Sequence, residues 1–352
     1  MDTLGIRAGR KRFPFGGWVP VCAVMLALGM ARTARSAQTA RLIPVDPPAE
    51  ANPLPPAAPQ KTPERFLRMD VNMVLVPVMV TDTADHPVMG LEKRNFALYQ
   101  DGEEQQIGYF STEDAPISVG LILDLSKSMT AKFEMERAAV SEFFKNANAQ
   151  DDYFVVTFSD RPKLVSGVTQ SIDAIESRLA LQVPDGNTAL FDAISEGASH
   201  MQSAQYRRKA LLIISDGGDN HSRHHLKEIK RVLQDSDLQV YAIGIFDMGP
   251  FKSLEESLGR AWLGRITGAT GGRAVAVDQP SKIPEAAAEI SREIRSQYVL
   301  GYRPNATTGD RSRRKIKVQV TPTAGPMALH TYYKSGYVPS DGAPSRSPVI
   351  TP

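Results

Sequence analysis

Three short stretches of the sequence carry side chains that could together bind a metal ion. Asp124, Ser126 and Ser128 alternate along the first stretch, and Thr188 and Asp216 lie in the other two. Together they offer three hydroxyls and two carboxylates, and hard oxygen donors of this kind suit Mg²⁺. We therefore expect a metal site if the fold brings the three stretches together.

The residues before these side chains predict elements that would position them. The apolar run at 117–123 ends at Asp124, and the run at 209–215 ends just before Asp216. Both runs predict buried strands, and an open α/β sheet keeps its ligand sites at the carboxyl ends of such strands. Thr188 precedes an expected helix and could also cap its N-terminus. Neighbouring strands would bring the two carboxylates together.

The chemistry of these donors predicts a binding mechanism. Hydroxyls from Ser126, Ser128 and Thr188 would bind the metal directly, and Asp124 and Asp216 would accept hydrogen bonds from metal-bound waters. Neutral ligands leave much of the metal charge uncompensated. An open coordination position would therefore attract an acidic side chain of a protein partner.

Strand and helix patterns alternate between residues 115 and 296. The expected strands are 117–124, 153–158, 209–215, 238–245 and 273–277, and the expected helices are 133–148, 172–181, 190–203, 226–234, 254–267 and 283–295. This rhythm predicts the α/β class, with a doubly wound, mainly parallel sheet and helices on both faces.

Two flanking segments, 68–114 and 297–340, show the period-two alternation of antiparallel strands. The expected strands are 71–80, 96–99, 106–110, 297–302, 315–320 and 329–333. Neither segment makes a convincing domain alone. We expect the N- and C-terminal segments to form one small β-sandwich-like module, with the α/β domain inserted between them.

Residues 1–36 have the layout of a secretory signal peptide, with a basic start, an apolar run at 18–30 and small residues near Ser36 and Ala37. The apolar run is shorter than the roughly 20 residues of a membrane-spanning helix. We expect a secreted or periplasmic mature chain without a transmembrane domain. The alternative is anchoring in the inner membrane by an uncleaved signal.

The composition limits the function classes. The chain has 352 residues and a formal net charge of +2, so no nucleic-acid partner is indicated. Its single cysteine, Cys22, lies in the expected signal peptide, which leaves the mature chain without thiolate catalysis or a cysteine zinc site. Residues 37–67 are rich in Pro and Ala and predict an extended linker, and 341–352 predict a disordered tail.

The five candidate ligands resemble a known motif. The Asp-x-Ser-x-Ser pattern at 124–128, the separate Thr188 and the pair Asp216-Gly217 resemble the metal-ion-dependent adhesion site, or MIDAS, of von Willebrand factor type A domains. All five ligand positions match, and the strand–helix order fits over 115–296. The flanks at 95–102 and 298–302 are similar to those of a bacterial group of secreted proteins related to this family.

The resemblance implies a central, mainly parallel sheet and cation-dependent protein binding in adhesion or complex assembly. The expected cation is Mg²⁺, with Mn²⁺ or Ca²⁺ as alternatives. A second hypothesis is a structural envelope protein in which the metal only stabilises the loops. A metal-dependent hydrolase is a third, but phosphatases of the haloacid dehalogenase type need a carboxylate where Ser126 stands, and no general base is evident. We therefore expect no enzyme.

Three other features have simpler interpretations. His221, His224 and His225 could suggest a second metal site, but their spacing favours a solvated loop and helix start. The glycine-rich residues 268–272 favour the end of a helix over a phosphate loop. Lys127, inside the metal loop, is expected to face solvent, where it could tune ligand access.

Overall fold

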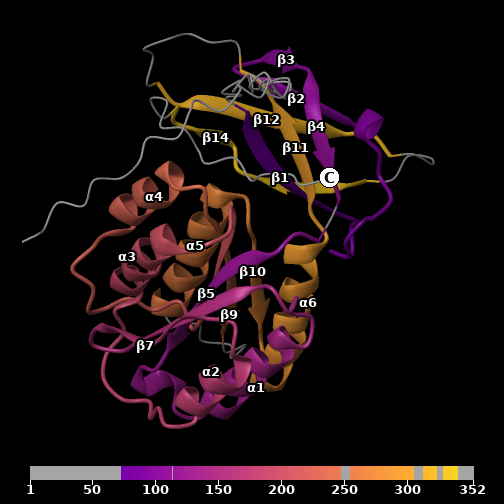
Figure 1. Cartoon of the computed structure of the whole chain (residues 1–352). Helices are drawn as coiled ribbons and strands as arrows, with labels where there is room; N and C mark the ends of the chain where they lie inside the picture. Colours follow the sequence, from indigo (N-terminus) through magenta and orange to yellow (C-terminus); the bar gives the residue numbers. More distant parts are fainter. Residues whose placement is uncertain (1–72, 113, 247–253, 305–311, 323–327, 340–352) are drawn as a thin grey trace, which may run out of the picture. The chain divides into compact units, whose positions relative to one another are not determined.

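The computed structural model describes residues 73–112, 114–246, 254–304, 312–322 and 328–339 (Figure 1). The predicted signal peptide, the Pro-rich linker at 37–67 and the tail at 341–352 lie outside these residues. In the described part of the chain, no helix is both long and apolar enough to span a membrane.

A six-stranded sheet forms the centre of the α/β part, in the order β10-β9-β8-β5-β6-β7, and only β7 is antiparallel to its neighbour. Its strands are β5 (Ile117–Asp124), β6 (Asp152–Phe158), β7 (Pro162–Thr169), β8 (Arg208–Ser215), β9 (Gln239–Ile245) and β10 (Ala274–Val277). Every residue of β5, β6 and β9 is buried, because helices cover both faces.

Three helices pack on each face of this sheet (Figure 1). One face is covered by α1 (Phe133–Phe144), α2 (Ile172–Leu179) and α6 (Ile283–Arg295), and the other by α3 (Leu190–His200), α4 (Leu226–Asp235) and α5 (Leu254–Thr270). Separate apolar cores fill the two interfaces, one beneath each layer of helices. The predicted doubly wound fold is confirmed.

The edge strand β7 was not predicted from the sequence. It has one neighbour, β6, and its side chains are only partly covered, with Leu164 40% and Val168 47% exposed. Its pattern is therefore neither a continuous apolar run nor a clean alternation. The helix expected at 133–148 also proved too long, because α1 ends at Phe144.

Two four-stranded antiparallel sheets, ordered β13-β1-β11-β4 and β14-β12-β2-β3, form a second part of the molecule. The strands are β1 (Val74–Thr81), β2 (Phe96–Gln100), β3 (Glu103–Gln105), β4 (Ile107–Ser111), β11 (Tyr298–Tyr302), β12 (Arg314–Val320), β13 (His330–Tyr333) and β14 (Gly336–Tyr337). Each sheet combines strands from both ends of the described chain, and one apolar core is shared by both. The expected sandwich-like combination of the two segments is confirmed.

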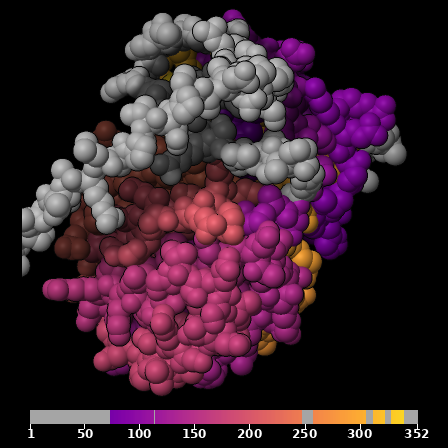
Figure 2. Space-filling model, viewed as in Figure 1, coloured from indigo at the N-terminus to yellow at the C-terminus, as the bar shows by residue number. Residues whose placement is uncertain are grey.

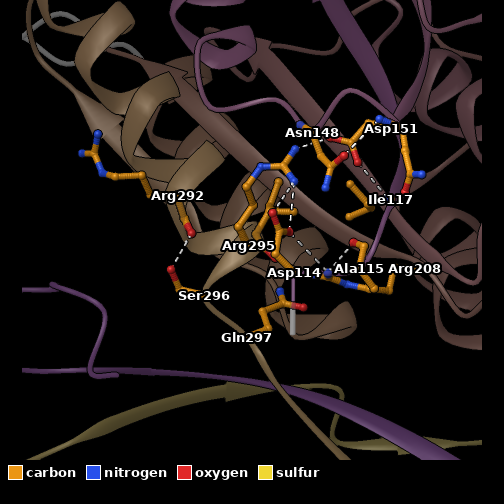
Figure 3. Close-up of polar contacts among 12 residues, drawn as sticks. Asp114, Ala115, Ile117, Asn148, Asp151, Arg208, Arg292, Arg295, Ser296 and Gln297 are labelled. Atoms are coloured by element: carbon orange, nitrogen blue, oxygen red, sulfur yellow. Dashed lines mark hydrogen bonds and ion pairs between the residues drawn. The ribbon is translucent and has the colours of Figure 1, made fainter. Parts of the chain in front are cut away.

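The chain enters and leaves the α/β part at points that are joined by two arginines (Figure 3). Arg295, the last residue of α6, donates from Nη1 to Asp114 Oδ1 at 3.0 Å. Arg208 donates from Nη1 to the carbonyl oxygen of Ala115 at 2.7 Å and from Nη2 to that of Ile294 at 2.6 Å. The first and last residues of the α/β part are thus held together.

Candidate metal centre

The predicted stretches meet at the carboxyl ends of β5 and β8. The two strands are parallel neighbours, with Leu123 paired to Ile214, so their last residues lie at the same edge of the sheet. The stretch before Thr188 reaches this edge as well, because the Lys127 amide donates to the Gly186 carbonyl oxygen at 3.1 Å.

Oxygen atoms from two of the stretches are in direct contact. The hydroxyl oxygens of Ser126 and Ser128 are hydrogen bonded at 3.0 Å, and the Ser128 hydroxyl donates to Asp216 Oδ2 at 2.6 Å. Ser126 is buried and Ser128 is exposed. The cluster therefore opens to the surface at Ser128.

Asp124 lies fully buried beneath this cluster. Its Oδ1 accepts a hydrogen bond from the Ser126 amide at 2.9 Å, and its Oδ2 accepts one from the Ser215 hydroxyl at 2.6 Å. Ser215 in turn accepts from the Gly217 amide at 2.9 Å. Ser215 was not among the predicted site residues, although it directly precedes Asp216; its hydroxyl fixes the Asp124 carboxylate.

Thr188 is positioned through its backbone. Its amide donates to Asn220 Oδ1 at 3.0 Å, and its carbonyl oxygen accepts from the amides of Asn220 at 3.0 Å and His221 at 3.1 Å. The expected capping role is wrong, because the N-cap of α3 is Ala189. The amides of the first turn of α3 donate instead to the side chains of Asp219 and Ser222. Among the described residues, no hydrogen bond joins the Thr188 hydroxyl to the other four candidate ligands.

The histidine-rich loop is held by a buried carboxylate of α3. Asp192 Oδ1 accepts from the amides of Arg223 and His224, both at 3.0 Å, and bonds the His224 ring nitrogen at 2.7 Å. Burial raises the pKa of Asp192, but the hydrogen bonds from His224 and Arg223 outweigh it and hold the pKa below its usual value. His225 forms a capping box with Glu228 at the start of α4.

The three histidines thus lie in an exposed to half-buried loop that leads into α4, as expected for a solvated loop and helix start. Within the described ranges, no group of three or more histidine, cysteine, aspartate or glutamate side chains is arranged to hold a metal. Because Asn220 belongs to the same loop, the Asp192 hydrogen bonds also support the backbone of Thr188.

Negative charge in the centre is uncompensated. Burial and the nearby charge of Asp216 raise the pKa of Asp124 to about 7. Behind it, Glu136 of α1 accepts from the Asp124 amide at 3.2 Å through Oε1, and its buried Oε2 has no partner. Burial, with the charge of Asp124, raises the Glu136 pKa well above its usual value. No ion pair found among the described residues includes any of these three carboxylates.

The donor chemistry therefore fits a divalent cation. Hydroxyl and carboxylate oxygens converge, and a cation would offset both the burial and the repulsion from Asp216 that raise the pKa of Asp124. Glu136 was not predicted to belong to the site. Its place on the apolar face of α1, between Phe133 and Val140, could have indicated a buried carboxylate.

The backbone beside Asp216 packs directly on a helix. Gly217 has φ +78°, a conformation that favours glycine, and it faces Gly259 of α5. A methyl group at Gly259 would lie 2.7 Å from the carbonyl carbon and oxygen of Gly217 and 3.0 Å from the carbonyl oxygen of Asp216. The glycine at 259 thus permits the close approach of α5 to this candidate ligand.

Comparison with known protein families identifies the α/β part. Residues 119–218, which include all five candidate ligands, match the family model described as von Willebrand factor type A domain. The protein therefore contains a von Willebrand factor type A domain, as the motif indicated. The match supports a protein-interaction module in general. No curated protein matches the chain.

Solved structures with some likeness to this chain include three proteins of different origin. The conserved hypothetical protein BatB from Bacteroides thetaiotaomicron is 18% identical, with a TM-score of 0.41, over 51% of this chain and 100% of that one. A von Willebrand factor type A protein from Catenulispora acidiphila is 13% identical, with a TM-score of 0.45, over 69% and 74% of the two chains. Proximal thread matrix protein 1 from the mussel byssus, with a zinc occupied MIDAS motif, is 16% identical, with a TM-score of 0.45, over 56% and 50%.

Proposed function

We propose that the protein is a cation-dependent protein-binding module that acts in adhesion or complex assembly. Ser126, Ser128 and Thr188 would hold Mg²⁺ directly, and Asp124 and Asp216 would accept hydrogen bonds from its waters. Mn²⁺ and Ca²⁺ are alternative ions. The contact between Ser126, Ser128 and Asp216 at the open end of β5 and β8 is the observation that carries this proposal.

The bound cation would supply a positive charge that attracts a carboxylate of the partner. The residues of this chain prepare the site for it. Asp124 is fixed by the Ser126 amide and the Ser215 hydroxyl, and Ser128 lies at the surface where a partner can reach it. Two hydrogen bonds, at 2.9 and 2.6 Å, thus orient the buried carboxylate before any cation binds.

We propose binding rather than catalysis. A serine nucleophile needs an adjacent general base, and none of the hydrogen bonds made by the Ser126 and Ser128 hydroxyls goes to a histidine. A domain that only binds a protein partner needs no general base.

The predicted signal peptide supports a location in the cell envelope or the secreted space, or at the inner membrane if the signal is not cleaved. A purely stabilising metal is the second candidate function. It is favoured by the buried carboxylates of Asp124 and Glu136, whose repulsion a cation would reduce without any partner.

The test compares partner capture from the native envelope by crosslinking, with Mg²⁺, with EDTA and with Ser126→Ala. Capture that needs both Mg²⁺ and the Ser126 hydroxyl is expected. Ser203→Ala is a matched control, since Ser203 is exposed and bonds only the His200 carbonyl oxygen among described residues. Equal capture in all conditions would contradict the metal bridge, and a Mg²⁺-dependent rise in Tm without metal-dependent capture would favour the stabilising role.

A further inference from the structure

The loop that leads to Thr188 carries the two most exposed large apolar side chains of the described residues. Leu181 is 80% exposed and Val183 is 79% exposed, whereas the next, Met89, is 53% exposed. Single exposed apolar residues are ordinary on protein surfaces, but two almost fully exposed ones separated by one residue form a local apolar feature. We call Leu181 and Val183 the apolar rim.

Hydrogen bonds hold this loop beside the candidate metal loop. The Asp185 amide donates to the Leu125 carbonyl oxygen at 2.8 Å, and the Lys127 amide donates to the Gly186 carbonyl oxygen at 3.1 Å. Consecutive Cα atoms are about 3.8 Å apart, so the Cα of Val183 lies within about 7.6 Å of that of Asp185. Val183 therefore lies near the metal loop, and Leu181 lies two residues further along the same loop.

The loop is also fixed in place before any partner binds. The backbone amide and the side-chain amide of Asn187 both donate to Asp160 Oδ1, at 2.9 and 2.8 Å. At the other end, the Gln182 amide donates to the Leu179 carbonyl oxygen at 3.0 Å. A surface ordered in advance loses little conformational entropy on binding. Figure 2 shows the magenta to pink part of the chain, to which this loop belongs, on the viewed face of the molecule.

We propose that the apolar rim is a second contact of the binding site and that it selects partners with an apolar side chain near the acidic one. This inference rests on the proposed function. The partner segment has an Asp or Glu for the cation and for exposed Lys127, and a Leu, Ile, Val or Phe two or three residues away. That spacing follows from the short reach between the rim and the metal loop.

The test uses the full-length protein and bead-displayed peptides in buffer with Mg²⁺. Each peptide has one Asp in a Gly/Ser background, with either Leu or Ser two or three residues away. Burial of one Leu side chain corresponds to roughly tenfold or more in affinity. We expect the Leu peptides to bind at least about tenfold more tightly than the Ser peptides.

Two variants test whether the preference for Leu peptides comes from the apolar rim or from exposed apolar side chains in general. The double variant Leu181→Ser, Val183→Ser should lose the preference for Leu peptides and keep its binding to Ser peptides. Its Tm should not change, because both side chains are almost fully exposed. Leu164→Ser is the matched control, since Leu164 is exposed on edge strand β7 and should leave the preference intact.

The outcomes distinguish this inference from the proposed function. Mg²⁺-dependent binding that is equal for Leu and Ser peptides, or a preference that survives in the double variant, would overturn the rim and leave the metal bridge standing. If no peptide binds in a manner that depends on Mg²⁺ and on Ser126, both fail.

Discussion

The contact between Gly217 and Gly259 predicts that a single methyl group on α5 will disturb the candidate metal centre. In Gly259→Ala, the new Cβ would start 2.7 Å from the Gly217 carbonyl carbon and oxygen, whereas ordinary contacts of a Cβ begin at 3.4 Å. The difference, 3.4 − 2.7 = 0.7 Å, must be absorbed by a shift of backbone on one side or the other. Neither side offers a flexible side chain that could rotate away.

This displacement is large for a metal site. Ligand groups must be held within about 0.5 Å of their working positions, and Mg²⁺ demands near-ideal octahedral geometry. We expect Gly259→Ala to weaken Mg²⁺ binding by about tenfold or more. Overpacking costs about 1–3 kcal/mol, against a gain of about 0.5–1 kcal/mol from replacing a helical glycine by alanine. The net loss of unfolding free energy should be about 1 kcal/mol, the difference between the midpoints of these two ranges.

Calorimetric Mg²⁺ titration and urea unfolding would measure the two effects. Gly264→Ala provides a matched control on the same helix, because a Cβ there would meet nothing within 4 Å. The control should gain about 0.5–1 kcal/mol and bind Mg²⁺ like the wild type. Wild-type stability and affinity in Gly259→Ala would refute the packing argument. Lower stability with unchanged affinity would show that α5 shifts and that the candidate metal loop stays in place.

Two other substitutions test the surroundings of the centre. Asp192→Asn should lower the unfolding free energy by about 1–3 kcal/mol near neutral pH, because the buried carboxylate makes charge-assisted hydrogen bonds. The pKa of Asp192 is depressed in the folded protein, so the extra unfolding free energy of the wild type over Asp192→Asn should be full above about pH 5 and shrink as the pH falls below about 4. Urea unfolding of both proteins at several pH values would measure this. A difference in unfolding free energy that does not change with pH would contradict the prediction. Arg295→Met should cost about 3 kcal/mol, because it leaves the fully buried carboxylate of Asp151 without its cation and removes one of the two arginines beside Asp114. The control is Arg292→Met, because Arg292 lies one turn earlier on α6 and is exposed; it should change the unfolding free energy by less than about 0.5 kcal/mol. If chemical denaturation shows that the two variants lose the same unfolding free energy, the ion pairs of Arg295 contribute little.

The parts of the fold that were predictable are those whose residues face the same surroundings along their whole length. Strands β5 and β9 are buried throughout, so their apolar runs stood out, and α6 has the predicted bounds because its apolar spacing is regular. Edge strand β7 was missed because one side has no neighbour and its side chains are mixed. The two-residue strand β14 is too short to show any period.

Within the site, the residues that carry candidate metal-ligand oxygens could be predicted from the sequence, but the residues that position them could not. Asp124 and Asp216 end predicted strands, so the sheet itself implied that they lie close together. The hydrogen bond from Ser215 depends on side-chain direction at the strand end, and the need for Gly259 arises only when α5 packs on Gly217. Such requirements come from contacts between distant segments, which periodicity does not encode.

The arginines that join the start and end of the α/β part also bear on the order in which the chain folds. Strand β1 pairs with β11, and Val78 and Tyr298 are partners across 298 − 78 = 220 residues. Closing so long a loop in a disordered chain is entropically unfavourable and slow. Once the α/β part has folded, Arg295 and Arg208 hold its two ends together, and the loop between β1 and β11 shrinks to short connections. We therefore expect β1 to pair with β11 only after the α/β part has folded, whereas the hairpin of β2 and β3 can form locally.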